Sequence, residues 1–437
     1  MARSRGVHVA ALSVLVLLAV AVTGCKMNRY KSTWRTDVNA PLNARFVVAG
    51  DSAVILRFGP TRAEGRLAGY SLASGDERWQ QPAPEFILES AMGAPLAAAD
   101  AEQQVVYLVQ DSTVAAHSVS DGARRWIADV KHLTSTFEDF TNVQAPAGAG
   151  GRVLLLSRHS RIVALDRQDG KLLWRTDGGG SNRASVLAVV GGVVLTLSNE
   201  EKDVRGHDLA TGKQLWVRPM SDPFEETERL SASIALAARR PQDGLDLFHV
   251  VDGKRALLAL DAKSGAVKWE QPVVGLTSFA FAGSLLVVTD GASVRGVDPA
   301  SGQAKWRQPT GGLSLVAPLD ATTALLHLAR STCTVDAASG KIREHATHLL
   351  HEQDHLLDAA PGLVAMTTDN GTARLFSRDG EKLIETTIGE TVPRPGNPFA
   401  HGLQQAAIAG DGVVLFNTAH ELERFAKARS ANNLPSR

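Results

Sequence analysis

Short runs of β-branched and aliphatic residues recur along the chain, and Gly, Asp and Asn separate them. Clear examples are the runs Val153–Leu156, Val193–Leu197, Leu285–Thr289 and Val413–Phe416. Short apolar runs that end at such turn residues predict β-strands. The sequence Asp369-Asn370-Gly371 separates two further runs and predicts a hairpin turn. Apolar residues show no helical period beyond the first 24 residues, so the pattern predicts an all-β protein.

One motif repeats through this β-rich region, about every 45 residues. The stretch Ile162–Trp174 recurs, for example, as Leu257–Trp269. Each copy contains a glycine, and these are Gly75, Gly122, Gly170, Gly212, Gly265, Gly302, Gly340 and Gly380. A tryptophan follows four residues later in six copies, at Trp79, Trp126, Trp174, Trp216, Trp269 and Trp306. The last two copies carry Glu344 and Ile384 at that position.

Each conserved position of the repeat has a physical reason. The glycine accepts the positive φ of a tight turn. The Ser, Thr or Asp before it, and the Asp or Ser four residues before it, can bind backbone amides of the same turn. The Gly or Ala six residues before it is expected to let two sheets approach closely. The tryptophan offers a large apolar plate with an N–H at its edge, which suits packing between neighbouring sheets.

The two ends of the chain complement each other. Lys31–Asp37 echoes Lys171–Asp177 and contains Trp34, but it lacks the strands that precede the tryptophan in the other copies. At the other end, Ala406–Ala409, Val413–Phe416 and Glu421–Phe425 predict three strands without a fourth. We therefore expect the N-terminal strand to complete the last sheet and close a ring, which removes free sheet edges.

These features together predict a closed β-propeller of four-stranded blades over residues 31–426. Strict counting gives nine blades, namely eight motif copies and one blade split between the two ends. Because nine-bladed rings are rare, the first expectation is eight blades, with one repeat degenerate.

The N-terminus has the features of an export signal. Arg3 and Arg5 precede the uncharged apolar run Val9–Val22, which is short for a membrane span. The sequence Val22-Thr23-Gly24-Cys25 resembles a bacterial lipobox, in which the cysteine receives lipid. It predicts a signal peptide over residues 1–24, a lipidated Cys25 and a linker over 25–30. At the other end of the chain, we expect residues 427–437 to form a disordered tail. An ordinary signal peptide with a chance cysteine is the alternative.

The repeat also resembles a known family. Its pattern Ala-x-Asp-x-x-Ser/Thr-Gly-x-x-x-Trp is similar to the tryptophan-docking repeat of the quinoprotein (PQQ) propeller superfamily, over roughly residues 31–426. Together with the lipobox, it most resembles the BamB family of outer-membrane protein assembly lipoproteins. The resemblance implies an eight-bladed scaffold that binds no quinone or other cofactor and assists the machine that inserts β-barrels. Lys26 after the cysteine implies, by analogy, sorting to the periplasmic face of the outer membrane.

The resemblance also implies one partner-binding residue. In the BamB family an arginine in a loop after the third tryptophan helps to bind the barrel-assembly protein. The nearest match here is Asn182-Arg183-Ala184-Ser185, so Arg183 is the candidate. It departs from the family pattern because Asn182 replaces an apolar residue and Gly178–Gly180 precedes it. A solvated arginine without a partner is the alternative.

Composition narrows the possible functions. Lys+Arg and Asp+Glu both number 46, and this balance gives no electrostatic case for nucleic acid or a broad anionic membrane surface. The two cysteines, Cys25 and Cys333, exclude a disulfide framework within the chain and a four-thiolate metal site. Quinoprotein dehydrogenases usually carry two adjacent cysteines, whereas Cys333 stands alone. We therefore expect no enzyme activity, and we interpret Cys333 as a small buried strand residue.

Three polar segments remain. His345, His348, His351 and His355 could bind a metal through their imidazoles. We expect them instead on the polar rim of a connection between two blades. The acidic residues Glu225, Glu226 and Glu228, and the segment Pro393–His401, are expected to be exposed loops. A propeller that binds saccharide or peptidoglycan is a second possible function, which aromatic side chains exposed on the rim would favour.

Overall fold

The part of the chain that the structure describes is built from antiparallel β-strands. This computed structural model describes residues 30–38, 45–57, 65–85, 96–100, 102–110, 113–130, 140–144, 152–157, 161–177, 184–198, 203–219, 237–238, 247–252, 256–272, 278–290, 293–310, 313–328, 331–347, 355–360, 362–367, 372–377, 382–387, 406–416 and 421–427. Cys25 and Arg183 lie outside these ranges, as do Gly380, the acidic residues 225–228 and the segment 393–401. No helix within these ranges has the length and apolarity to cross a membrane.

The described strands form nine sheets of four strands each, and we call each sheet a blade. Blades 1 to 3 consist of β2 (Arg45–Ala49), β3 (Ser52–Arg57), β4 (Arg66–Ser71) and β5 (Glu77–Pro82); β6 (Leu96–Asp100), β7 (Val105–Gln110), β8 (Thr113–Ser118) and β9 (Arg124–Asp129); and β10 (Phe140–Gln144), β11 (Arg152–Ser157), β12 (Arg161–Asp166) and β13 (Leu172–Asp177). Blades 4 to 6 consist of β14 (Ala184–Val190), β15 (Val193–Ser198), β16 (Asp203–Asp208) and β17 (Gln214–Pro219); β18 (Ala237–Ala238), β19 (Leu247–Asp252), β20 (Ala256–Asp261) and β21 (Val267–Pro272); and β22 (Ser278–Ala282), β23 (Leu285–Thr289), β24 (Ser293–Val297) and β25 (Ala304–Pro309).

The remaining blades complete the set. Blade 7 consists of β26 (Leu313–Pro318), β27 (Thr323–Leu328), β28 (Ser331–Asp336) and β29 (Ile342–Thr347), and blade 8 of β30 (His355–Ala360), β31 (Leu363–Thr367), β32 (Thr372–Ser377) and β33 (Lys382–Thr387). The split blade combines β34 (Ala406–Ala409), β35 (Gly412–Phe416) and β36 (Glu421–Lys427) with β1 (Tyr30–Asp37).

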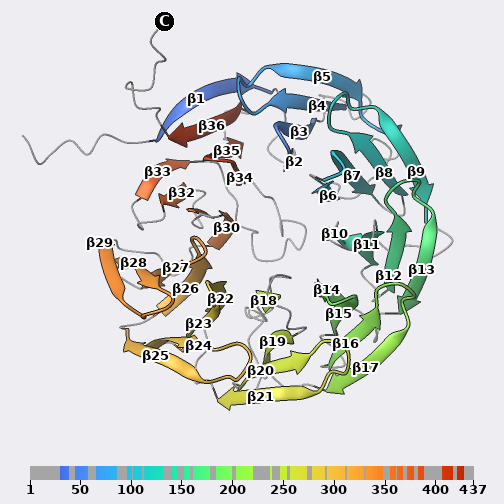
Figure 1. The fold of residues 1–437 in the computed structure, drawn as a ribbon. Helices are drawn as coiled ribbons and strands as arrows, with labels where there is room; N and C mark the ends of the chain where they lie inside the picture. Colours follow the sequence, from blue (N-terminus) through green and yellow to red (C-terminus); the bar gives the residue numbers. More distant parts are fainter. Residues whose placement is uncertain are drawn as a thin grey trace, which may run out of the picture.

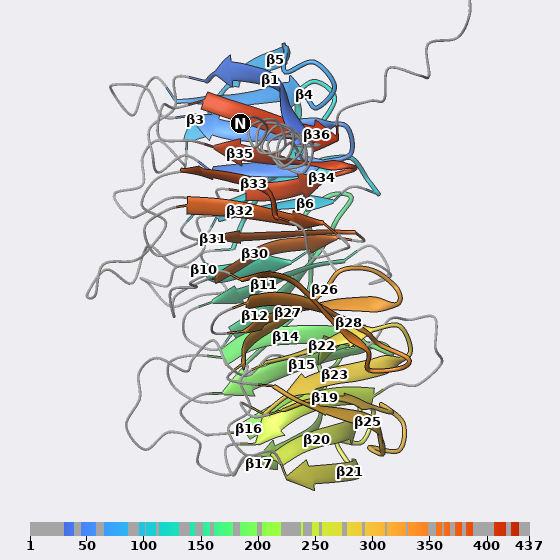
Figure 2. The same cartoon turned by 90° about the vertical axis from the view of Figure 1, so that its left-hand side faces the viewer.

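The nine blades form a closed propeller (Figure 1). Neighbouring blades contact each other all the way round, for example through the inner strands β30 with β34 and β34 with β2, while blades 3 and 4 meet through β11 and β14. The fourth strand of each blade lies on the outer wall (Figure 1). Seen edge-on, the ring is a disc (Figure 2). The first expectation of eight blades is therefore wrong, and the strict count of nine is confirmed for the described residues.

The physical reason is that the degenerate repeat still forms a complete blade. Blade 8 lacks the tryptophan and the Asp or Ser four residues before its glycine, yet β31 and β32 pair in register on either side of the predicted hairpin turn. Phe376 stands where the other copies have Asp or Ser, and it is fully buried against Leu319 and Val364. Alternation of apolar residues is sufficient for a strand, so losing the tryptophan did not remove the sheet.

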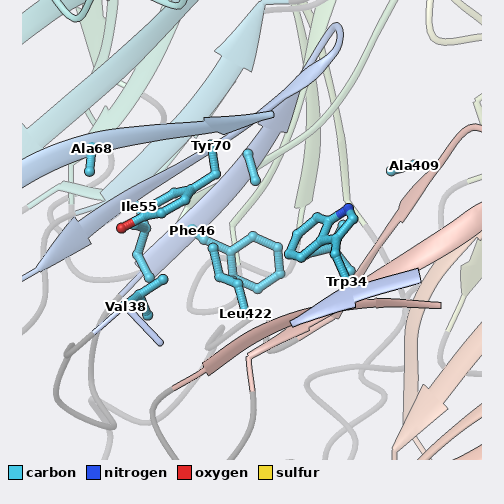
Figure 3. Packing of buried hydrophobic residues seen from close by; sticks show 10 residues of the cluster. Trp34, Val38, Phe46, Ile55, Ala68, Tyr70, Ala409 and Leu422 are labelled. Carbon is cyan, nitrogen blue, oxygen red and sulfur yellow. The ribbon is translucent and has the colours of Figure 1, made fainter. Parts of the chain in front are cut away.

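The predicted closure by the N-terminal strand is confirmed. β1 pairs antiparallel with β36, from Tyr30 opposite Lys427 to Asp37 opposite Glu421, just beyond the predicted bounds of the ring. The cluster in Figure 3 contains Trp34 and Val38 from the start of the chain, Phe46 and Tyr70 from blade 1, and Leu422 from the end. Both chain ends therefore share one hydrophobic core with blade 1.

Each tryptophan joins its blade to the next one. Trp34 on β1 donates its indole N–H to the carbonyl of Leu72 at 2.8 Å, and its ring covers Gly75 in the same turn of blade 1. Gly75 has a φ of +80°, so this turn requires glycine both for its backbone conformation and for the close approach of the indole. The same bond recurs at Trp79, Trp126, Trp174, Trp216, Trp269 and Trp306, with N–O distances of 2.7–2.9 Å.

The small residue of the motif has a different role from the one expected. Gly69 lies opposite Trp79 on the paired strand of the same blade, and a Cβ at Gly69 would overlap the indole. Ala116 pairs with Trp126 in the same way. The small side chain therefore makes room for the tryptophan of its own blade. It does not bring two separate sheets together.

Candidate interaction surface

The outer wall of the ring carries the largest exposed apolar side chains in the described part of the chain. They are Ile127 on β9, Leu172 and Leu173 on β13, and Leu215 and Val217 on β17, and each is 38–47% exposed. These strands are the fourth strands of blades 2, 3 and 4, which follow one another around the ring (Figure 1). We call these five residues the aliphatic rim. Five exposed aliphatic residues on three consecutive blades suit contact with another macromolecule better than contact with water.

The repeat supplies an internal comparison for this surface. The residues on either side of the tryptophan are polar or charged in the split blade and in blades 1, 5 and 6: Thr33 and Arg35, Arg78 and Gln80, Lys268 and Glu270, and Lys305 and Arg307. Blades 2 and 3 have one aliphatic residue at these positions, and blade 4 has two, Leu215 and Val217. Blade 4 therefore departs furthest from the pattern that keeps an outer strand soluble.

The strand β17 also has a free edge. It pairs with β16 on one side and is the last strand of its sheet in the described part of the chain. Along it, Leu215 and Val217 are exposed, whereas Trp216 and Arg218 between and beyond them are half-buried. Because successive side chains of a strand point to opposite faces, the two aliphatic residues share one face of β17.

Charges around β17 are mainly cationic. Arg205 lies opposite Val217 on β16, and its guanidinium forms two hydrogen bonds with the Asp203 carboxylate, at 2.7 and 2.9 Å. Burial raises the pKa of Asp203 and lowers the pKa of Arg205. Lys213 and Arg218, at the two ends of β17, form no such pair with the described residues, and Arg218 Nε is buried without a hydrogen-bond partner among them.

The ring interior contains several buried polar groups, but they form pairs within or between blades. His207 on β16 is fully buried, and burial lowers its pKa to about 4. Asp100 at the end of β6 and Arg167 in the turn after β12 form a buried ion pair at 3.0 Å. Burial also raises the pKa of Tyr107, whose ring lies 5.9 Å from that of Trp126. The ion pair connects blades 2 and 3, whereas the other contacts lie within one blade, and none of these groups belongs to a catalytic cluster among the described residues.

The structure places the remaining candidates as follows. Cys333 is buried on β28 opposite Leu326, as expected for a small strand residue. His345 lies on β29, an outer strand, and His355 on β30, the inner strand of the next blade, while His348 and His351 lie outside the described residues. The segment that joins β29 and β30 lies outside the described residues, so the placement of the four histidines on a connection between two blades stays a prediction. No group of three metal ligands occurs among the residues that the structure describes.

Sequence reasoning missed the aliphatic rim, although its signal was present. The glycine and the tryptophan define the repeat, whereas the residues beside the tryptophan differ between copies. Comparison of these neighbouring residues alone singles out Leu215 and Val217. The turn contacts were predicted well: Asp261 Oδ1 accepts from both the backbone N–H and the hydroxyl of Ser264, at 2.9 and 2.7 Å.

Comparisons with known proteins agree with this architecture. The chain is similar in structure to BamB from Moraxella catarrhalis, with 13% identity, a TM-score of 0.53 and coverage of 76% of this chain and 96% of that one. It is also similar to Sqt1 from Saccharomyces cerevisiae, with 9% identity, a TM-score of 0.52 and coverage of 79% and 98%. A third similar structure is the computationally designed Ika8 protein, with 13% identity, a TM-score of 0.50 and coverage of 77% and 98%. These likenesses show the fold.

The sequence comparison identifies the family. No curated protein sequence matches the chain. The family described as "Outer membrane protein assembly factor BamB" matches residues 30–174, 134–241 and 200–432. These matches overlap and extend over the same part of the chain as the nine blades. The chain therefore belongs to the BamB family, with nine blades where the resemblance implied eight.

Proposed function

We propose that this protein is a lipid-anchored periplasmic scaffold and an accessory component of the outer-membrane β-barrel assembly machinery. The observation that carries the proposal is the family match, which spans the whole ring. The aliphatic rim supports it, because exposed aliphatic side chains suit a protein partner. A saccharide site usually needs aromatic plates, and the tryptophans of the described chain are buried or half-buried.

The anchor is Cys25, at the end of the sequence Val22-Thr23-Gly24-Cys25. Lipidation with several acyl chains would hold the ring at the membrane, where a single chain binds only reversibly. The variant Cys25→Ala is expected to move from the membrane fraction to the soluble periplasmic fraction. Mass spectrometry of the mature N-terminus checks this directly, and an unmodified cysteine there would exclude the anchor.

The partner in this proposal is the barrel-assembly protein, and Arg183 is its proposed contact. A guanidinium can form two charge-assisted hydrogen bonds with a carboxylate, so its loss at an interface can cost about 2 kcal/mol or more. Co-purification of Arg183→Ala with the barrel-assembly protein is the measurement, and Arg124→Ala, an exposed arginine on β9, is the control. If wild type itself recovers no barrel-assembly protein, the assembly role fails; if only the contact is wrong, Arg183→Ala binds like wild type.

The proposal also excludes quinone-dependent oxidation. Cys333 is buried in the core between blades 6 and 7, in a cluster with Val316 and Leu326. It has no adjacent cysteine with which to stack on a quinone. Reconstitution with quinone and calcium, followed by dye-linked alcohol oxidation, tests this point. Turnover above background would contradict a purely scaffolding role.

A further inference from the structure

The outer edge of β17 combines two properties that occur together on no other described outer strand. Its backbone edge has no neighbouring strand in the described chain. Both residues beside its tryptophan, Leu215 and Val217, are exposed and aliphatic, each with 43% of its surface accessible. Such an edge is a template on which another strand can form, and soluble proteins normally blunt it with charge.

Other blades carry charged residues at the positions of Leu215 and Val217, and such charges disfavour pairing with another strand. In β21 the equivalent residues are Lys268 and Glu270, and in β25 they are Lys305 and Arg307. The repeat thus tolerates charge at both positions, because these side chains point away from the core. Packing within the ring therefore gives no reason for Leu215 and Val217 to be aliphatic.

The charges of β17 indicate the kind of partner. Arg218 is half-buried on the face opposite Val217, and Lys213 immediately precedes the strand. Neither forms an ion pair with the described residues, whereas the neighbouring Arg205 is neutralised by Asp203. A partner strand with carboxylates beside Arg218 would supply the missing charge to the exposed part of its guanidinium.

We propose that the outer edge of β17 binds an extended segment of another protein as a fifth strand of blade 4. Aliphatic side chains of that segment lie beside Leu215 and Val217 on one face, and its carboxylates lie beside Arg218 on the other. Main-chain hydrogen bonds supply affinity in this mode, and alternate side chains supply selectivity. The inference does not depend on the lipid anchor or on the role in barrel assembly.

The test uses the Cys25→Ala full-length chain and two short synthetic peptides. One alternates valine and glutamate, and the other alternates valine and lysine. We expect the glutamate peptide to bind more tightly and to protect from hydrogen exchange those backbone amides of residues 214–218 that do not donate to β16. The variant Leu215→Lys/Val217→Glu, which copies the side chains of β21, is expected to weaken binding by about tenfold or more. Arg218→Gln is expected to remove the preference for glutamate over lysine.

A reciprocal variant tests whether these side chains suffice. Lys268→Leu/Glu270→Val/Gln271→Arg gives β21 the pattern of β17 and is expected to create a second protected edge at residues 267–271. An unchanged melting temperature shows that each variant is folded. The proposal is overturned if Leu215→Lys/Val217→Glu binds like wild type, or if the reciprocal variant gains no protection. It is equally overturned if the outward-facing β17 amides, which do not donate to β16, are already protected without peptide, or if light scattering shows that a second copy of the chain occupies the edge.

Discussion

Arg35 and Glu423 face each other across the β1–β36 pair, although 388 residues separate them in the chain. The Arg35 Nη2 group donates to both carboxylate oxygens, at 2.9 and 3.0 Å. The Glu423 side chain is almost wholly buried, whereas that of Arg35 is 55% exposed. The ring thus closes with a charged pair as well as with backbone hydrogen bonds, and the buried carboxylate depends on the N-terminal strand for its partner.

The variant Arg35→Ala is expected to lower the free energy of unfolding by about 1 to 2 kcal/mol. The buried Glu423 carboxylate loses its donor, but the exposure of Arg35 to solvent moderates the effect. Denaturant titration followed by tryptophan fluorescence is the measurement. The control is Arg78→Ala, which removes an arginine whose partner, Asp51, is mostly exposed. An equal loss in both variants would show that the closing pair is no stronger than a surface pair.

Deletion of residues 29–37 is expected to cost several kcal/mol, because it removes the whole of β1, including the buried Trp34. It also exposes the edge of β36, so concentration-dependent association should appear in light scattering. An unchanged melting temperature would mean that the ring does not need this strand.

The sequence predicted those parts of the fold that depend on local patterns. The turn contacts, the docking tryptophans and the closing strand each correspond to a short sequence pattern that recurs in several copies of the repeat. The pair of Asp100 and Arg167 could not be predicted, because its members lie 67 residues apart and occur in one copy only. The role of Gly69 was misjudged because the strand register that places it opposite Trp79 depends on an irregularity between Gly69 and Tyr70.

The buried ion pair of Asp100 and Arg167 joins blades 2 and 3, and its contribution to stability can be tested by substitution. Most other blades end their first strand with an apolar residue, such as Ala49 or Ala282, although blade 3 ends it with Gln144. At the position of Arg167 the other copies have an apolar residue such as Leu72 or Leu209, except for Ser377 in blade 8. Either single variant, Asp100→Ala or Arg167→Leu, is expected to cost about 3 to 5 kcal/mol, because it leaves a buried charge without a partner.

The double variant Asp100→Ala/Arg167→Leu restores the apolar pattern of the other blades. It is expected to lie within about 1 kcal/mol of wild type, or to be more stable. A double-mutant cycle from denaturant titrations measures the coupling. Additive losses in the double variant would show that the two side chains act independently.

His207 predicts a loss of stability in mild acid. Burial lowers its pKa in the folded state to about 4, below the ordinary value of 6.5. Between these two values the unfolded chain binds more protons than the folded one. His207 therefore does not reduce the free energy of unfolding above pH 6.5. As the pH falls from 6.5 to 4, the free energy of unfolding decreases, and the total decrease is about 3 kcal/mol below pH 4.

The variant His207→Leu, which copies Leu165 and Leu260 of other blades, should flatten this part of the pH profile. Unfolding free energies between pH 4 and pH 7 for wild type and variant are the measurement. Burial also lowers the pKa of His117, so wild type and variant should both retain a smaller slope from that residue. Parallel profiles for the two proteins would rule out His207 as a source of acid sensitivity.

Replacement of a turn glycine by alanine should reduce stability by an amount that depends on whether a tryptophan covers that glycine. Gly170 has a φ of +71° and lies under the indole of Trp126, whereas Gly192 has a φ of +77° and no atom near the position of a Cβ. Replacement of either by alanine imposes backbone strain of about 1 kcal/mol. Gly170→Ala must in addition displace Trp126, which donates its N–H to the Arg167 carbonyl at 2.8 Å. Its total cost is therefore expected to exceed that of Gly192→Ala by about 2 kcal/mol.

The double variant Gly170→Ala/Trp126→Ala separates the two effects. Trp126→Ala alone should cost about 3 to 5 kcal/mol, because it empties a buried aromatic site between blades 2 and 3. Once the indole is gone, the added methyl group meets no ring, so the double variant should be less destabilised than the two single variants together. Thermal and denaturant unfolding of the four proteins measure this coupling. Equal costs for Gly170→Ala and Gly192→Ala, with no coupling to Trp126, would mean that contact with the indole does not determine the glycine at this turn.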